Sequence, residues 1–347
     1  MAHKTQDIYL SDRDKDVLKE VIGTYVDTAE PVGSRTLAKK SGLGLSPATI
    51  RNVMADLEEM GLLFQPHVSA GRVPTESGLR YFVDCLLEKE SLSWGDQVAI
   101  EQTIKSEQAD LVALLKKAVR LLADFSGQAA MITTPAPSKA SLHHIDFVLI
   151  KPGLVLVIAV SGSGLMQQRL VSVSPDLDQD FMDNMASYFN EKLKEVGFKQ
   201  AKEAVVKELE RDKDVLEEFL GNLVDDKRTE SISSDLIVGG ELNLLDYPEF
   251  ASISRARTVL RKLKEKHVLL TLLDQCVHED GPKVIIGSEG LGQELECGLV
   301  IAPYKAGDEA LGSLGVIGPM RMNYARALAL VEYTAEVLSE WVKEMEK

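Results

Sequence analysis

The segment from residue 33 to residue 53 carries four cationic side chains and no acidic one: Arg35, Lys39, Lys40 and Arg51. The chain as a whole is acidic, because its 347 residues contain 39 Lys and Arg against 54 Asp and Glu, a net charge of −15. Guanidinium and ammonium groups bind phosphate oxygens through charge-assisted hydrogen bonds, so the segment predicts contact with a polyanion. A solvated basic surface without any partner would have the same composition. The elements that present these side chains therefore decide between the two interpretations.

Two uncharged polar residues flank the last of these cations, Arg51. Thr49 and Asn52 are three positions apart, which places them on one face of a helix. An asparagine side chain pairs with adenine through two hydrogen bonds, and an arginine binds guanine or a phosphate. Acidic residues begin only at Asp56, toward the end of the same stretch. This polarity is typical of a helix that inserts its amino-terminal end into the major groove of DNA.

Three helices are predicted before residue 61. Ser11 and Asp14 form an amino-terminal cap for the first helix, which continues as an apolar stripe at helical spacing (Val17, Leu18, Val21, Ile22 and Tyr25). The second helix is expected to begin with Ser34 as its cap and to end at Gly42. The third has Ser46 as its cap, Pro47 at its first position and Gly61 as its stop, with a stripe of apolar residues (Ile50, Val53, Met54, Leu57 and Met60). Two helices joined by a short glycine-containing turn are a helix-turn-helix.

The stretch HVSAGRVPT, residues 67–75, predicts the tip of a wing. It fits between two short strands, Leu62 to Gln65 and Arg72 to Pro74. Gly71 is expected to permit the turn, and Arg72 to be the cation that the tip extends toward DNA. Thr75 then caps another helix. The alternative interpretation of residues 1–90 is a small helical bundle that contacts proteins, because periodicity and caps do not identify DNA as the partner.

Metal, cofactor and membrane sites are not indicated. The chain has three cysteines, an odd number, at positions 85, 276 and 297, and their spacing is not that of metal ligands. We therefore expect Cys85, Cys276 and Cys297 to be free thiols of a cytoplasmic protein. The sequence shows no apolar run long enough for a bilayer and no secretory signal at its start. A nucleophilic role for Cys297 would need a nearby histidine, and none lies close in sequence, so we expect no enzyme.

The rest of the chain predicts an α+β arrangement. One helix over 98–125 precedes three antiparallel strands in HHIDFVLI, LVLVIAV and LMQQRLVSVS and a helix from Leu177 to Val196. Residues 199–225 are charged and predicted to form a surface or coiled helix. A helix from Ser254 to Lys266, three more strands and a closing helix from Asn323 follow. The order resembles a GAF-like sensor domain, and its glycine-rich turns SGSG (161–164) and GSEGLG (287–292) leave a metabolite-sensing regulator as an alternative.

Several motifs are similar to those of the HrcA family, the heat-inducible repressors of bacterial chaperone operons. The motifs are SPATIRN with DLE and GLL, then SAGRVPT, KVIIGSE and GPMRMNY, so the likeness runs from about residue 10 to the end. The resemblance implies a winged helix-turn-helix (1–90) and a GAF-like domain in two parts (91–198 and 266–347), interrupted by an inserted dimerisation segment (199–265).

The resemblance also implies the partners and the contact residues. A homodimer would bind double-stranded DNA at an inverted-repeat operator upstream of chaperone genes, and a GroE-type chaperonin would promote the active fold. The implied base and phosphate contacts are Ser34, Arg35, Thr36, Ser46, Thr49, Arg51, Asn52 and Arg72, to which the charge pattern adds Lys39 and Lys40.

Overall fold

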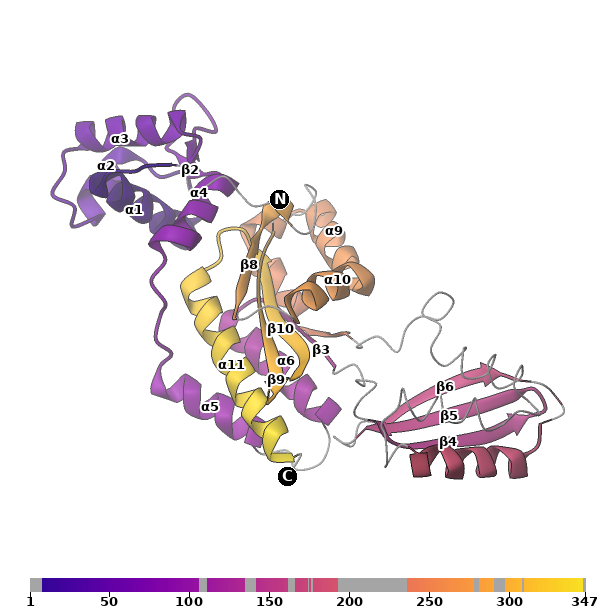
Figure 1. Cartoon of the computed structure of the whole chain (residues 1–347). Helices are drawn as coiled ribbons and strands as arrows, with labels where there is room; N and C mark the ends of the chain where they lie inside the picture. Colours follow the sequence, from indigo (N-terminus) through magenta and orange to yellow (C-terminus); the bar gives the residue numbers. More distant parts are fainter. Residues whose placement is uncertain are drawn as a thin grey trace. The chain divides into compact units, whose positions relative to one another are not determined.

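A computed structural model describes residues 8–105, 111–134, 142–161, 166–173, 175, 177–192, 236–277, 281–289, 297–307 and 309–345 (Figure 1). The chain divides into two compact units. Unit 1 comprises Met1–Thr133 and Leu236–Ser339, and unit 2 comprises Thr134–Asp235 and Glu340–Lys347. Within the described residues, no helix is both long and apolar enough to cross a membrane.

The three amino-terminal helices form as predicted, with small differences at their ends. Helix α1 (Asp12–Thr28) begins at a complete capping box between Ser11 and Asp14, and α3 (Pro47–Glu59) begins at Ser46. The predicted apolar stripes of both helices are buried, except that Tyr25 is half-buried and Met60 is exposed. Met60 lies just beyond the last turn of α3, as its C-cap residue.

The start of α2 (Ser34–Lys40) differs from the prediction. Gly33, not Ser34, occupies the capping position, and no side chain caps the helix. Ser34 is already helical, so its hydroxyl cannot take the capping geometry that an extended residue has. The helix also stops at Lys40, because the backbone of the next residue, Ser41, is extended. The hydroxyl and the backbone N–H of Ser41 both donate to the Leu37 carbonyl and so satisfy this end of the helix.

The wing and the helix that follows it complete the winged helix. Strands β1 (Leu63–Phe64) and β2 (Val73–Pro74) pair antiparallel. Thr75 caps α4 (Glu76–Tyr81) by accepting from the backbone N–H of Gly78, and a π-helical turn (Phe82–Leu86) continues it. The predicted winged helix-turn-helix is therefore confirmed.

The predicted single helix over 98–125 is wrong. The structure has two helices, α5 (Trp94–Lys105) and α6 (Leu111–Ser126), and the residues between them lie outside the described part of the chain. The apolar stripe that suggested one helix belongs to α6, whose buried residues include Leu114, Leu115 and Leu122.

A five-stranded antiparallel sheet forms the centre of the second half of unit 1. Its order is β7 (Leu236–Gly239), β3 (Ala129–Thr133), β10 (Glu309–Pro319), β9 (Cys297–Ala306) and β8 (Lys283–Ile286). On one face, helices α9 (Ile253–Lys264) and α10 (Lys266–Val277) share an apolar cluster with β9 residues such as Leu299 and Ile301. The alternate residues Val300 and Ala302 point to the opposite face and are buried as well, so both faces are covered. Short 3₁₀ helices (Glu241–Asp246, Pro248–Phe250 and Gly287–Glu289) and the long α11 (Tyr324–Met345) complete this part.

Unit 2 contains the predicted three-stranded meander. Strands β4 (Leu142–Lys151), β5 (Leu154–Ser161) and β6 (Met166–Ser172) pair in sequence order and pack one face against a helix at residues 179–192. Asn190 on that helix binds both the N–H and the carbonyl of Ile145 at 2.8 Å. Gln179 likewise binds the N–H of Leu149 and the carbonyl of Phe147. These two amides satisfy backbone groups of the edge strand β4 that would otherwise be open to pairing.

The chain passes between the two units at residues 133/134, 235/236 and 339/340, whereas we expected an inserted segment at 199–265. The described part of that segment, residues 236–265, belongs to unit 1, because β7 pairs with β3 and Val259 and Leu263 join the cluster under the sheet. Residues 199–235, including the charged helix expected there, lie outside the described residues. The α+β fold class is confirmed, and the three-stranded meander forms a sheet separate from that of β8–β10.

Candidate nucleic-acid interface

The recognition helix α3 presents its polar face because its apolar face is fixed by the core. Ile50, Val53 and Leu57 are buried. On the other side, Arg51 and Asn52 are exposed and Thr49 is half-buried. Thr49, Arg51 and Asn52, the residues predicted to contact bases or phosphates, therefore lie together in the amino-terminal half of one helix.

Ser46 and Thr49 form a hydroxyl pair at the start of α3. The Oγ of Ser46 accepts from the backbone N–H of Thr49 at 3.1 Å, and the two side-chain oxygens lie 2.9 Å apart. Because the pair has two hydroxyl protons and uses one between them, one proton remains for an outside acceptor. The cap thus holds a hydrogen-bond donor at the end of the helix that would enter the groove.

Four cations surround these polar residues. Arg35, Lys39 and Lys40 on α2 and Arg51 on α3 are exposed, as is Thr36. Within the described residues none of the four has an acidic partner within ion-pair distance. Arg35 and Lys39 are four residues apart and share a face of α2. We call the surface formed by α2 and the first two turns of α3 the acid-free surface.

The loop of the wing is ordered by one glutamine that the sequence did not single out. The Gln65 amide donates to the carbonyls of Val68 and Ala70, and Ala70 donates to the carbonyl of His67. These bonds close a tight loop in which Val68 has 98 % of its surface open to solvent. An amide that closes a loop of this length leaves only a weak sequence signal, because its partners are backbone groups.

Arg72 is not extended from the tip, contrary to our prediction. It lies at the base of the wing, where its backbone N–H and carbonyl pair with Val32 at 2.9 and 2.8 Å. Its guanidinium forms an ion pair with Glu58 at 2.8 Å, and its side chain is only 18 % exposed. The other oxygen of Glu58 accepts from the N–H of Gln65. One carboxylate at the end of α3 therefore connects the recognition helix to both sides of the wing.

Gly71 has a different role from the one predicted. Its φ is not among the positive values of the chain, so the turn itself does not need a glycine. Instead, an added Cβ would overlap the backbone of Val32 and Gly33. Glycine is required here because the wing and the strand-like segment before α2 approach each other closely.

The cysteines, the candidate metal ligands and the glycine-rich turns do not form a second functional site among the described residues. Cys276 and Cys297 are buried, and Cys297 belongs to the apolar cluster under the sheet. In the described part of the chain, no group of three His, Cys, Asp or Glu could hold a metal ion. Of the two glycine-rich turns, residues 162–164 and 290–292 lie outside the described residues.

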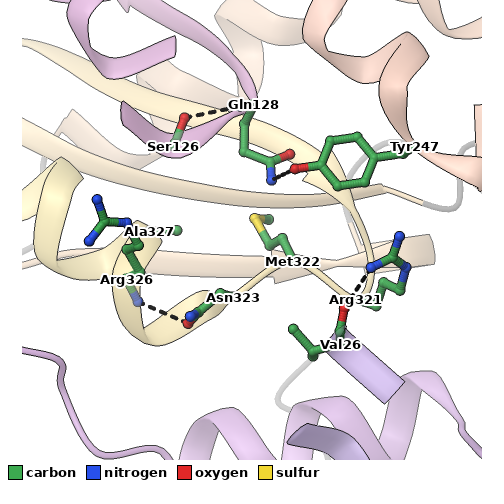
Figure 2. Close-up of a pocket in the computed structure, with 9 residues that line it drawn as sticks. All are labelled: Val26, Ser126, Gln128, Tyr247, Arg321, Met322, Asn323, Arg326 and Ala327. Atoms are coloured by element: carbon green, nitrogen blue, oxygen red, sulfur yellow. Dashed lines mark hydrogen bonds between the residues drawn. The ribbon is translucent and has the colours of Figure 1, made fainter. Parts of the chain in front are cut away.

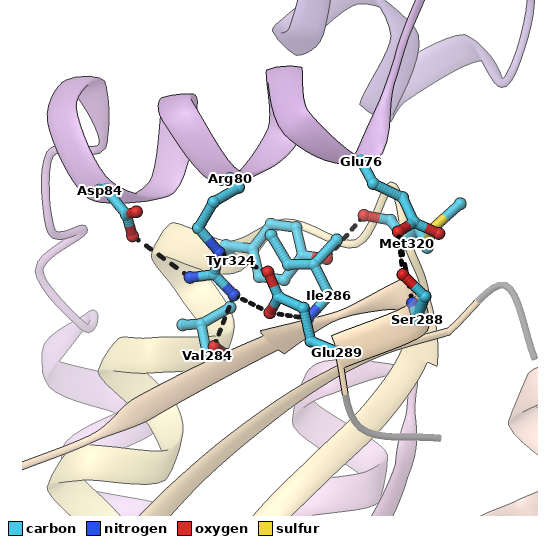
Figure 3. A network of polar contacts seen from close by, with 9 residues as sticks. All are labelled: Glu76, Arg80, Asp84, Val284, Ile286, Ser288, Glu289, Met320 and Tyr324. Carbon is cyan, nitrogen blue, oxygen red and sulfur yellow. Dashed lines mark hydrogen bonds and ion pairs between the residues drawn. The ribbon is translucent and has the colours of Figure 1, made fainter. Parts of the chain in front are cut away.

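The described part of GSEGLG joins the winged helix to the sheet (Figure 3). The carboxylate of Glu289 pairs with Arg80 of α4, and Ser288 donates to Glu76 at 2.6 Å. Arg80 also donates to the carbonyl of Val284 at 2.8 Å. Burial alone would lower the pKa of Arg80, but its hydrogen bonds to Glu289 and Asp84 raise that pKa above the ordinary value. The described part of this glycine-rich turn is thus occupied by the guanidinium of Arg80, which pairs with Glu289.

A pocket of about 190 Å³ lies beside α11 in unit 1 (Figure 2). Its cations are already paired: Arg321 binds Glu249 and donates to the Val26 carbonyl at 2.6 Å, and Arg326 lies 3.4 Å from Asp96. The side-chain oxygen of Gln128 is buried in its wall without a partner among the described residues. The pocket therefore offers a polar wall but no free charge for an ionic metabolite.

Comparison with known proteins identifies the amino-terminal part of the chain as a DNA-binding domain. Residues 9–81 match the family described as "Winged helix-turn-helix transcription repressor, HrcA DNA-binding", and residues 112–328 match "HrcA protein C terminal domain". The Heat-inducible transcription repressor HrcA of Syntrophobacter fumaroxidans is 38 % identical over 343 residues, covering 96 % of this chain and 98 % of the relative. That of Geobacter sulfurreducens is 37 % identical over 334 residues, with coverages of 95 % and 97 %.

A crystal structure of a hypothetical protein at 2.2 Å resolution shares the fold, with a TM-score of 0.64 and 23 % identity over 97 % of this chain and 100 % of that one. The relatives are named as transcription repressors, in agreement with the expectation that the chain is not an enzyme. The chain therefore belongs to the HrcA family of heat-inducible transcription repressors and binds DNA through a winged helix.

Proposed function

We propose that the chain represses heat-shock chaperone genes by binding, as a homodimer, an inverted-repeat operator upstream of them. The observation that carries the proposal is the acid-free surface: four exposed cations, unpaired among the described residues, around Thr49 and Asn52 in a chain of net charge −15. The net negative charge of the chain disfavours non-specific binding to a polyanion, so a local surface without acids is favourable for the approach of DNA.

Within the acid-free surface, the side chains divide into two groups. Arg35, Lys39, Lys40 and Arg51 are placed to bind phosphates and set the register, while Asn52 and the free hydroxyl proton of the Ser46–Thr49 pair read base edges. The remaining predicted contacts, Ser34 and Thr36, lie on the first turn of α2. Arg72 supports this arrangement by holding the wing against α3.

Dimerisation is proposed for unit 2, on the sheet face opposite its helix. Val148, Leu156 and Leu170 lie side by side across the three strands, because Leu156 pairs with both others in the register. Leu170 is 59 % exposed, and the nearby Ile150 is 53 % exposed. A contiguous apolar row of this kind is unfavourable in water. A second copy that covers it would bring two recognition helices to a fixed separation, as an inverted repeat requires.

Regulation by a GroE-type chaperonin is proposed on the family likeness. If the chaperonin promotes the active fold, heat would divert it to other clients and lift repression. Operator binding by the purified protein, measured through the heat-shock temperature range with and without chaperonin, tests this. Binding that is equally strong in both conditions at every temperature would contradict it. Since the operator lies on the bacterial chromosome, we place the protein in the cytoplasm.

A mobility-shift assay on DNA from upstream of chaperone genes tests the proposed function directly. The protein should form a discrete complex with a duplex that contains the inverted repeat. The matched control is the same duplex with one half of the repeat scrambled, which leaves length and charge unchanged. Equal binding to both duplexes would contradict operator recognition by a dimer.

A further inference from the structure

Helix α9 is strongly basic, although it lies outside the winged helix. Residues 252–264 contain five cations and no acid: Arg255, Arg257, Arg261, Lys262 and Lys264. In a chain with 15 more acids than bases, this local excess opposes the average charge. The contacts described above for the winged helix do not involve these residues.

The packing of α9 aligns three of these cations. Val259 and Leu263 are buried in the apolar cluster under the sheet, which fixes the rotation of the helix. Arg257, Arg261 and Lys264 are exposed and follow one another at intervals of four and three residues. They therefore form one stripe along the solvent side, about 10 Å long at 1.5 Å per residue. We call these three residues the α9 stripe.

The stripe keeps its charge free. Lys262, which is half-buried, pairs with Glu265 at 3.1 Å, and Arg255 donates to the backbone carbonyl of Glu249. By contrast, no carboxylate of the described residues lies within ion-pair distance of a stripe cation. The α9 stripe is therefore ready to bind an anionic partner without first breaking an internal ion pair.

The start of α9 is connected to the winged helix within unit 1. Glu249, just before α9, pairs with Arg321. The guanidinium of Arg321 also donates to the Val26 carbonyl near the end of α1, as Figure 2 shows. Val32, which follows Val26 by six residues, pairs through its backbone with Arg72 at the base of the wing. A short series of polar contacts thus links α9 to the element that docks on DNA.

We propose that the α9 stripe binds the phosphate backbone of double-stranded DNA that flanks each operator half-site. The inference rests on the operator binding proposed above. The stripe has three aligned cations and no neighbouring side chain that is proposed to read bases. A duplex suits it, because the backbone carries one negative charge per roughly 1.7 Å of axis and binds cations at many positions along its length. The stripe adds affinity and salt dependence without adding base preference.

The test uses the full-length protein and two duplexes, namely the inverted repeat alone and the repeat extended by about one helical turn, ~10 bp, at each end. Affinities are measured by fluorescence anisotropy between about 50 and 200 mM salt. The wild type should bind the extended duplex more tightly and with a steeper salt slope, by about 0.9 for each added phosphate contact. Over that salt range, each contact amounts to about a three- to fourfold loss of affinity.

The R257Q/R261Q/K264Q variant should bind the bare repeat as the wild type does and gain nothing from the flanks. The R257K/R261K variant keeps the charges and should keep the gain. K116Q/R120Q removes two exposed cations at the same four-residue spacing on α6 and should also keep it.

A gain from the flanks that persists in R257Q/R261Q/K264Q would overturn the proposal. The proposal would also be wrong if the variant weakens self-association in sedimentation while its DNA binding is unchanged, because the stripe would then contact an acidic surface of a second copy. If the wild type does not prefer the repeat over scrambled DNA, operator recognition is refuted instead. In that case the salt slopes of the wild type and of R257Q/R261Q/K264Q on the two duplex lengths would still show whether the stripe binds phosphates.

Discussion

Replacing Arg72 with alanine separates a supporting role from direct contact with DNA. In the structure the guanidinium is held at 2.8 Å by Glu58, and the two side chains are 18 % and 34 % exposed. A cation that is already neutralised contributes little to counterion release when DNA binds. We therefore expect Arg72→Ala to lower the stability of the wing and to leave the number of phosphate contacts unchanged.

The size of the effect follows from the environment of the ion pair. A fully exposed pair contributes up to about 1 kcal/mol, whereas hydrogen bonds to charged groups that are partly desolvated contribute about 1.5–3 kcal/mol. Glu58 keeps its bond to the N–H of Gln65 at 3.1 Å after the substitution, which limits the loss. The free energy of unfolding should fall by about 1–2 kcal/mol, between these two limits.

Two measurements distinguish the two roles of Arg72. Denaturant unfolding gives the change in stability, and the slope of log affinity against log salt gives the number of phosphate contacts. Arg51→Ala is the matched control, because Arg51 is exposed and has no ion-pair partner among the described residues: its slope should fall by about 0.9 per subunit, with stability changed by no more than about 0.5 kcal/mol. A fall of that size for Arg72→Ala, with unfolding unchanged, would show that Arg72 leaves Glu58 to bind a phosphate and would refute the reasoning.

Three further predictions follow from exposure, register and burial. Asn52→Ala should weaken binding to the cognate repeat by about 1–3 kcal/mol and relax base preference at one position, and unchanged discrimination in a competition assay would count against base readout. Leu156→Asp with Leu170→Asp should turn the dimer into a monomer in sedimentation, and an unaltered dimer would exclude that sheet face. Burial raises the pKa of Tyr304 and Tyr324 above the ordinary value of 10.0. Because the folded state then holds protons that the unfolded state releases, stability should fall as pH rises above about 10; Tyr324→Phe should flatten that fall in denaturant titrations, and an unchanged profile would contradict it.

Local signals in the sequence predicted the winged helix well. The caps at Ser11, Ser46 and Thr75 depend on residues three positions apart, so they form wherever the sequence places them. The apolar stripes of α1 and α3 likewise followed from helical spacing. Ser34 was misplaced by one position, because Gly33 and Ser34 both accept the start of a helix and only the tertiary structure chooses between them.

Features that depend on distant partners were not predictable in the same way. The pairing of Arg72 with Glu58 brings a wing residue to the end of a helix, and a charge in a sequence does not show which acid it meets. The central sheet joins β3 to β10 and β7 over long separations, so the sequence alone did not indicate that β4–β6 form a sheet of their own. The α9 stripe was not predicted either, because the solvent side of this helix is set by the packing of Val259 and Leu263 against the sheet, which is a contact between distant segments.

The central claim is that the acid-free surface binds the operator, and one comparison tests it most directly. Wild type and an R51Q/N52A variant are titrated against the same inverted repeat from upstream of a chaperone gene, after circular dichroism has shown equal helix content and melting. Both substitutions lie on the exposed side of α3, away from the buried Ile50 and Val53. The account predicts a discrete complex for the wild type, and for the variant both weaker binding to the repeat and a smaller preference for the repeat over scrambled DNA. A variant that binds the repeat as tightly and as selectively as the wild type would contradict it.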